Sequence, residues 1–230
     1  MRTKLLNFII LPILVIVVML PRVLPFSPLF LTSDEVQIGH WTTQMAHALL
    51  AGDWANTVNN AYPAVTLMWL ETAQVAPGQM LTGAPMLMDT EQDVFASLPR
   101  RRLALGLVNS LVVVVGFELL RRLFNPFVAF TATLLIALDP FLLSQARVFR
   151  TEGLNAGLMM LSALALLLYV KEKRKGWLLL SSLLGGWAVL TRFNSIYLLA
   201  WTGFSVAVGR LWMGERRVLG LLKGVGGDML

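Results

Sequence analysis

The sequence of 230 residues contains no cysteine and only two histidines. The absence of cysteine excludes disulfides and thiolate metal sites. The two histidines, His40 and His47, stand seven residues apart, whereas metal-binding histidine pairs on a helix usually stand one turn apart. We therefore predict no metal ligands among the candidate site residues, and the use of a divalent metal cofactor is left open.

Charged residues are also scarce. They make up 14% of the chain, against 57% hydrophobic residues and a mean hydropathy of +0.70. A soluble domain carries far more charge, so the chain is predicted to be an integral membrane protein. Its formal net charge of +6 could suggest nucleic-acid binding. However, the basic residues stand in short groups between apolar runs, which is typical of membrane topology, so we exclude nucleic acid as a partner.

The apolar runs predict an all-α fold, a polytopic transmembrane helical bundle of about six to seven spans. A first span covers 1–31 and is expected to stay uncleaved, since no Ala-x-Ala site follows it. Residues 32–102 are predicted to form a large external loop, 103–217 the further spans, and 218–230 the start of an incomplete seventh span. The further spans are expected at 103–120, 126–144, 153–170, 177–191 and 195–209.

The external loop is predicted to contain interfacial helical structure. Residues 32–50 show apolar positions at helical spacing on one face and polar positions on the other, which indicates an amphipathic helix lying along the membrane surface. A short apolar element follows at 65–70 and is too brief to span a bilayer. Residues 76–99 are rich in Pro, Gly, Met and acids, so we interpret them as an extended loop.

We predict a multi-pass protein of the plasma membrane, and the distribution of Lys and Arg predicts that its N-terminus is cytoplasmic. This topology places Asp34 and Glu35 on the extracytoplasmic side, directly after the first span. Three consecutive arginines, Arg100, Arg101 and Arg102, fall on the outer side against the topology rule. Arginine binds phosphate in bidentate fashion, so we interpret these three residues as candidate phosphate ligands.

Asp34 and Glu35 are the candidate catalytic residues. Thr32 and Glu35 have the spacing of a capping box, and acids favour the positive end of a helix, so a purely structural role explains the local sequence equally well. Their predicted place at the outer edge of the membrane favours catalysis, because a base must stand where an acceptor meets a lipid-borne donor. Both roles are compatible.

Arg147, Glu152 and Arg192 are the candidate residues for binding the donor phosphate, and the predicted topology brings them to the same side as Asp34, together with Arg150. Surface salt bridges of small energetic value are the alternative explanation. In the functional interpretation, the arginines neutralise the charge that builds up on a phosphate leaving group.

These features together resemble the GT-C superfamily of membrane glycosyltransferases, particularly the branch of protein O-mannosyltransferases and aminoarabinose transferases. The features that carry the resemblance follow one another in the family's order along the chain. They are Asp34-Glu35, Ala51-Gly52-Asp53-Trp54, Tyr62-Pro63, Ala146-Arg147, Thr151-Glu152, the basic turn at 171–175, and Leu190-Thr191-Arg192.

The resemblance implies an inverting transfer of a sugar from a polyprenyl-phosphate donor to a lipid, glycan or protein acceptor on the extracytoplasmic side. By its match to the family's first-loop acid, Asp34 is expected to be the catalytic base, with Glu35 beside it supporting the acceptor site. Arg192 stands where family members often have lysine near the donor phosphate. Because the family's enzymes are generally much longer, the chain is expected to correspond to their N-terminal transmembrane module.

A non-catalytic membrane scaffold or a transporter subunit is the alternative from another class. A transporter would show broken helices paired by an internal repeat and polar residues at mid-span. Here the polar candidates collect at one predicted rim of the bundle, which favours the enzyme.

Overall fold

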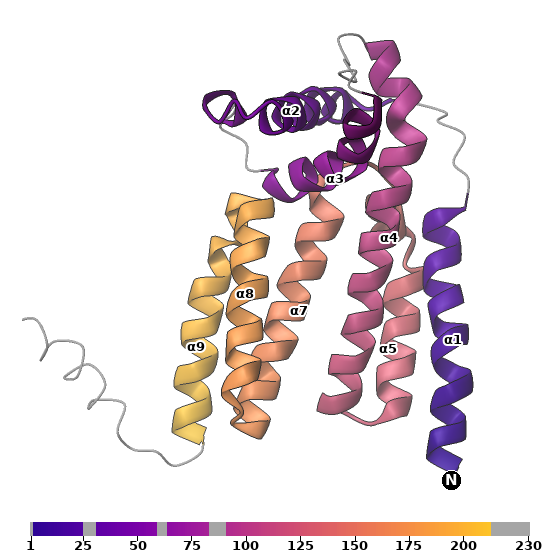
Figure 1. The fold of residues 1–230 in the computed structure, drawn as a ribbon. Coiled ribbons are helices and arrows are strands. Elements are labelled where there is room, and N and C mark those ends of the chain that lie inside the picture. The colour runs from indigo at the N-terminus through magenta and orange to yellow at the C-terminus, as the bar shows by residue number, and fades with distance from the viewer. Residues whose placement is uncertain (1, 25–30, 59–63, 83–90, 213–230) are drawn as a thin grey trace, which may run out of the picture.

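The computed structural model describes residues 2–24, 31–58, 64–82 and 91–212 (Figure 1). The described residues form helices and contain no strand, which confirms the prediction of an all-α fold. The elements in chain order are α1 (Arg2–Val23), α2 (Ser33–Leu50), η1 (Ala55–Thr57), α3 (Val65–Thr82), α4 (Glu91–Leu123), α5 (Pro126–Leu138), α6 (Pro140–Arg147), α7 (Thr151–Glu172), α8 (Lys175–Thr191), η2 (Phe193–Ile196) and α9 (Tyr197–Trp212).

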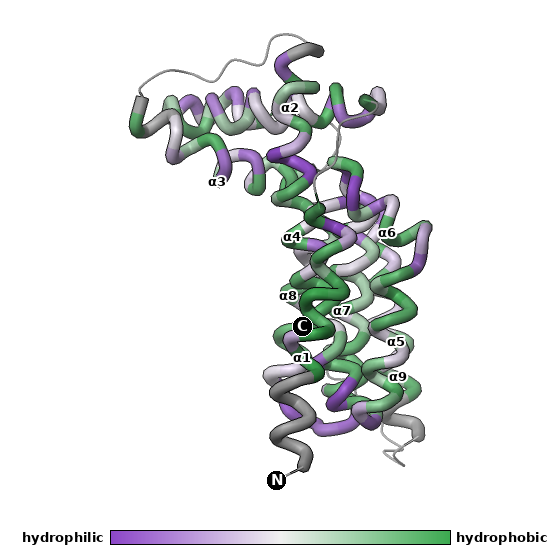
Figure 2. The backbone as a smooth tube through the Cα atoms, turned by 90° about the vertical axis from the view of Figure 1, so that its right-hand side faces the viewer, coloured by the Kyte–Doolittle hydropathy of each residue, from purple (hydrophilic) through white to green (hydrophobic). Residues whose placement is uncertain are grey.

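The helices form an upright bundle with a layer across one end. Helices α1, α4, α5, α7, α8 and α9 run roughly along a common direction, while α2 and α3 lie across the end remote from the start of α1 (Figure 1). We call this end the cap end, and the two helices that lie across it, α2 and α3, the cap layer. Figure 2 shows a hydrophobic band along the bundle, more hydrophilic residues at its two ends, and α2 and α3 reaching out past its side. This arrangement suits a bundle in a bilayer with an interfacial layer on one surface.

Two of the described helices are long and apolar enough to cross a membrane, namely Asp93–Leu123 within α4 and Thr151–Glu172, which is α7. Helices α5 and α6 form a pair bent by 60° that makes a third crossing if it counts as one span. The apolar part of α1 that meets the same test of composition is Ile10–Val23, and α1 ends well before residue 31. Crossings by α1, α8 and α9 therefore stay predictions, and the seventh span predicted at 218–230 lies outside the described residues.

The break between α5 and α6 follows from the dipeptide Asp139-Pro140. Proline cannot continue the hydrogen-bond ladder of α5 but fits the first turn of a new helix. The Asp139 carboxylate accepts a hydrogen bond from the Leu142 N–H at 2.8 Å and so caps α6. The span expected at 126–144 therefore consists of two helices with different directions, and α6 carries the chain to Arg147 at the cap end.

The prediction of an extended loop at 76–99 is wrong at both of its ends. Helix α3 continues through Pro77 to Thr82, and α4 begins at Glu91 and runs through Pro99. A proline inside a helix removes one hydrogen bond and disfavours the helix by about 3 kcal/mol. Packing opposes this penalty, because Val75 of α3 and Val94 and Leu98 in the first turns of α4 are all buried. The three arginines at 100–102 therefore lie inside a helix, not at its start.

Small residues bring neighbouring helices into close contact. A Cβ atom on Gly106 of α4 would lie 2.5 Å from the backbone oxygen of Arg22 in α1, so only glycine permits this crossing. Leu14 and Val18 of α1 are buried against Val113 and Phe117 of α4 in one hydrophobic cluster. Helix α1 is thereby fixed at a defined height against α4.

Candidate active site

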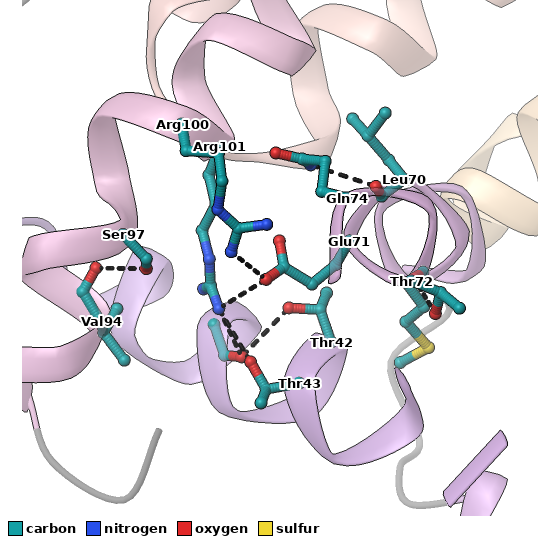
Figure 3. Close-up of polar contacts among 12 residues, drawn as sticks. Thr42, Thr43, Leu70, Glu71, Thr72, Gln74, Val94, Ser97, Arg100 and Arg101 are labelled. Atoms are coloured by element: carbon teal, nitrogen blue, oxygen red, sulfur yellow. Dashed lines mark hydrogen bonds and ion pairs between the residues drawn. The ribbon is translucent and has the colours of Figure 1, made fainter. Parts of the chain in front are cut away.

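The cap layer is anchored to the bundle by buried ion pairs on the three consecutive arginines of α4. Glu71 of α3 is fully buried, and one of its oxygens accepts hydrogen bonds from Arg100 at 2.8 Å and from Arg101 at 3.2 Å (Figure 3). Arg101 also donates to the Thr43 hydroxyl of α2 at 2.8 Å (Figure 3). A Cβ atom on Gly39 would collide with the Arg101 guanidinium, so this glycine makes room for the arginine. Arg101 thus joins α2, α3 and α4.

Glu35 makes the second buried anchor. It is fully buried, and its two oxygens accept hydrogen bonds from Arg102 Nε at 2.9 Å and Arg102 Nη2 at 2.7 Å. It also accepts from the backbone N–H of Phe149 at 2.8 Å, in the turn between α6 and α7. Burial by itself raises the pKa of Glu35, but the hydrogen bonds from Arg102 and Phe149 together with the Arg102 charge outweigh burial and hold this pKa below its ordinary value.

The same glutamate closes the capping box that the sequence indicates. The Glu35 N–H donates to the Thr32 hydroxyl, and the Glu35 carboxylate accepts from the Thr32 N–H, each at 3.3 Å. Helix α2 therefore begins at Ser33, and the two candidate catalytic residues lie in its first turn. Because neighbouring helical residues point about 100° apart, Glu35 points inward while Asp34 has 45% of its side chain exposed.

Asp34 belongs to a line of alternating charges that we call the rim network. Asp34 pairs with Arg150, the Arg150 Nε lies 3.7 Å from a Glu152 oxygen, and the other Glu152 oxygen pairs with Arg192. Each of these four side chains is between 31% and 45% exposed. Residues from α2, from the turn before α7, from α7 and from the end of α8 thus meet in one solvent-accessible row.

Buried polar contacts hold the elements behind the rim network. The hydroxyls of Thr66 in α3 and Thr191 in α8 lie 2.6 Å apart, one residue before Arg192. The Ser195 hydroxyl donates to the Asn155 side-chain oxygen at 2.6 Å and fixes η2 against α7. Arg192 and Glu152 are therefore presented from supported backbone, which favours a preorganised site.

The comparison with protein families finds one family model that matches this chain. The family model described as dolichyl-phosphate-mannose-protein mannosyltransferase matches residues 100–221, more than half of the 230 residues. The chain belongs to this family. As a member of the mannosyltransferase family it is a membrane glycosyltransferase of the GT-C kind, as the resemblance implied. No curated protein and no solved structure matched at the threshold of the searches.

The match to the mannosyltransferase family covers only part of the candidate site. Arg147, Glu152 and Arg192 lie inside the matched range, whereas Asp34 and Glu35 precede it. The structure brings Asp34, Glu152 and Arg192 together in the rim network. Arg147 is the half-buried last residue of α6, three residues before Arg150, so it lies on the segment that leads into the network.

Four arginines have carboxylate partners that the sequence does not indicate. Arg100, Arg101 and Arg102 are the candidate phosphate ligands of the sequence, but Arg102 is buried and holds Glu35, and Arg100 and Arg101 hold Glu71. Arg150 was expected on the outer side without a specific partner, and it pairs with Asp34. The abrupt run of arginines between apolar segments was the available signal, since buried arginines require carboxylates close by.

The described residues contain no group of three or more His, Cys, Asp or Glu side chains arranged to hold a metal ion. His40 and His47 lie on α2 and join no such group. The donor set of the described site therefore does not fit a divalent metal, and we derive no step through one.

Proposed function

We propose that the protein transfers a sugar from a polyprenyl-phosphate donor to a hydroxyl or amine of a lipid, glycan or protein acceptor, on the extracytoplasmic side of the plasma membrane. The cap end would face outward and the start of α1 inward. The observation that supports this most directly is that Asp34, an exposed carboxylate, lies in one charged row with arginines from distant parts of the chain. A base and phosphate-binding cations are the groups that this transfer requires.

The reaction would be a single displacement. The acceptor atom attacks the anomeric carbon while the bond from that carbon to the phosphate oxygen breaks, and the acceptor's proton passes to the Asp34 carboxylate. The electron pair of the broken bond remains on the phosphate, which leaves attached to its lipid. Attack from the face opposite the leaving group inverts the anomeric configuration.

Arg147 and Arg192 would neutralise the charge that develops on the leaving phosphate, since arginine suits the geometry of phosphate oxygens. Glu152 holds Arg192 in place before the donor arrives. A phosphate that pairs with Arg192 must then compete with the Glu152 carboxylate, which limits occupation of the site by weakly bound anions.

Glu35 would contribute by position. Its carboxylate is buried and bound to Arg102 and Phe149, so in this arrangement it has no surface for an acceptor. By fixing the first turn of α2 against the turn before α7, it would set the distance between Asp34 and Arg150. We therefore propose that Glu35 supports the acceptor site through Asp34.

The test is sugar transfer by purified protein in liposomes against a panel of polyprenyl-phosphate sugars. The change Asp34→Asn removes the base with little change in shape and should lower the transfer rate by about 100-fold or more. Glu118→Gln is the matched control, because Glu118 is 39% exposed and paired with arginine like Asp34 but lies at the other end of α4, outside the rim network. Full activity of the Asp34→Asn protein would remove the base assignment, and absence of transfer with every donor would favour the scaffold.

A further inference from the structure

A pocket of about 190 Å³ lies between α1, α4, α5, α6 and α7. Its walls are apolar, with Val112, Ile136 and Met160 among them, apart from two polar side chains, Arg22 and Asn109. Ala146 and Gly153 also line this pocket. They are the chain neighbours of Arg147 and Glu152, so the lining of the pocket comes within one residue along the chain of two candidate site residues.

Arg22 is a buried cation whose hydrogen bonds go to neutral backbone oxygens. It is 1% exposed, and its Nη1 donates to the backbone oxygens of Val18 at 2.8 Å and Ala137 at 3.1 Å. Its Nε has no hydrogen-bond partner within the described part of the chain. The other two buried arginines, Arg101 and Arg102, each hold a carboxylate. A buried guanidinium without an anion is strongly unfavourable, so Arg22 is matched to a negative charge that the described residues do not supply.

Asn109 adds a second unused donor on the same pocket. It is 5% exposed, and its Nδ2 has no partner among the described residues. Both side chains offer N–H groups, and only an occupant with acceptor oxygens satisfies them. The close crossing of α1 over Gly106 fixes the height of Arg22 against α4, so the position of this donor is built into the fold.

We propose that this pocket binds the donor lipid next to its phosphate, with the first units of the hydrocarbon chain against the apolar walls. The phosphate oxygens would accept from Arg22 and Asn109 on the bundle side, while Arg147 and Arg192 would approach the same phosphate from the rim side. The inference rests on the proposed function, because it identifies the occupant as the donor's carrier lipid. Apolar walls with a buried cation match a phosphate borne on an apolar chain. The contact with the residues next to Arg147 and Glu152 directs the sugar attached to that phosphate toward the rim network.

Binding of the carrier lipid without its sugar tests this assignment separately from catalysis. Purified protein in phosphatidylcholine nanodiscs is titrated with polyprenyl phosphate and with the uncharged polyprenol. Arg22→Gln should weaken polyprenyl phosphate binding by at least about tenfold and leave polyprenol binding unchanged, and Arg22→Lys should restore part of the loss. Ala156→Phe, which fills the pocket, should weaken both lipids. Arg174→Gln is the matched control, because Arg174 is a largely exposed arginine at the opposite end.

Three results would overturn the assignment. They are unchanged polyprenyl phosphate binding in Arg22→Gln, an equal loss for polyprenol, which would make Arg22 a structural residue, and equal displacement by phosphatidylglycerol, which would make the occupant an ordinary bilayer lipid. If Arg22→Gln does not fold, Asn109→Leu is measured with the same lipids and the same expectation. Arg22-dependent binding without any sugar transfer would overturn the proposed function alone, whereas sugar transfer that is insensitive to Arg22 would overturn this inference alone.

Discussion

Removing the Glu35 carboxylate should loosen the attachment of the cap layer to the bundle. Glu35→Ala leaves the Arg102 guanidinium, only 6% exposed, without its carboxylate, and leaves the Phe149 N–H without its acceptor. Loss of one partner from a buried ion pair typically destabilises by about 3–5 kcal/mol. Since about 1.4 kcal/mol corresponds to a factor of ten, the opening equilibrium at this contact should rise by roughly two to four orders of magnitude.

Hydrogen exchange read at the Phe149 amide measures this opening directly, because that amide is one of the groups the carboxylate holds. The exchange rate of Phe149 should rise by roughly the same two to four orders of magnitude, while amides in the middle of α7 keep their protection.

The matched control is Glu118→Ala at the other end of α4. Glu118 also pairs with two arginines, Arg121 and Arg122, but its side chain is 39% exposed. Exposed pairs one turn apart on a helix are typically worth about 0.3–0.5 kcal/mol each, so losing both pairs of Glu118 should raise exchange nearby by less than about tenfold. Similar effects of the two substitutions would refute the argument that burial sets the strength of the Glu35 anchor.

Two further predictions concern pH and the donor. The pKa of Glu35 in the folded protein lies below its ordinary value of 4.5. The ionised Glu35 should therefore stabilise the fold fully above about pH 4.5, and this stabilisation should be lost as the pH falls through the folded pKa. Thermal unfolding in detergent should show a loss of stability over this pH range in the wild type and a smaller loss in Glu35→Gln. Arg192→Ala should raise the KM for the polyprenyl-phosphate donor by about tenfold or more and change the KM for the acceptor little. Steady-state kinetics with each substrate varied in turn measures both KM values. An unchanged donor KM would count against a phosphate-binding role for Arg192.

Local rules were sufficient for several parts of this fold. The capping box at Thr32 depends on residues within one helical turn of each other, so the sequence alone predicts it. The interactions that begin α6 at Asp139-Pro140 are equally local. The apolar run at 153–170 likewise gives α7 nearly at its observed bounds, Thr151–Glu172. In each case the determining interactions are short in sequence and do not require the rest of the chain.

The misassigned parts depend on tertiary contacts. Pro77 and Pro99 each signal a loop locally, but the buried side chains of α3 and α4 override that signal. The pairing of Glu35 with Arg102 joins residues 67 positions apart, and that of Arg150 with Asp34 joins residues 116 apart. Composition places such groups at the same surface, but only the packing of helices decides which arginine faces which acid.

Asp34 and Glu35 contact the consecutive residues Arg150 and Phe149 across the fold. Two neighbouring acids of α2 therefore each bond to one of two neighbouring residues in the turn before α7. Insertion of a single residue before Asp34 would turn Asp34 toward the protein interior in place of Glu35. Glu35 would then lose its alignment with Arg102. Sliding of α2 along the bundle is blocked for the same reason, so the exposed acid keeps its place only as long as the hidden one beside it stays engaged.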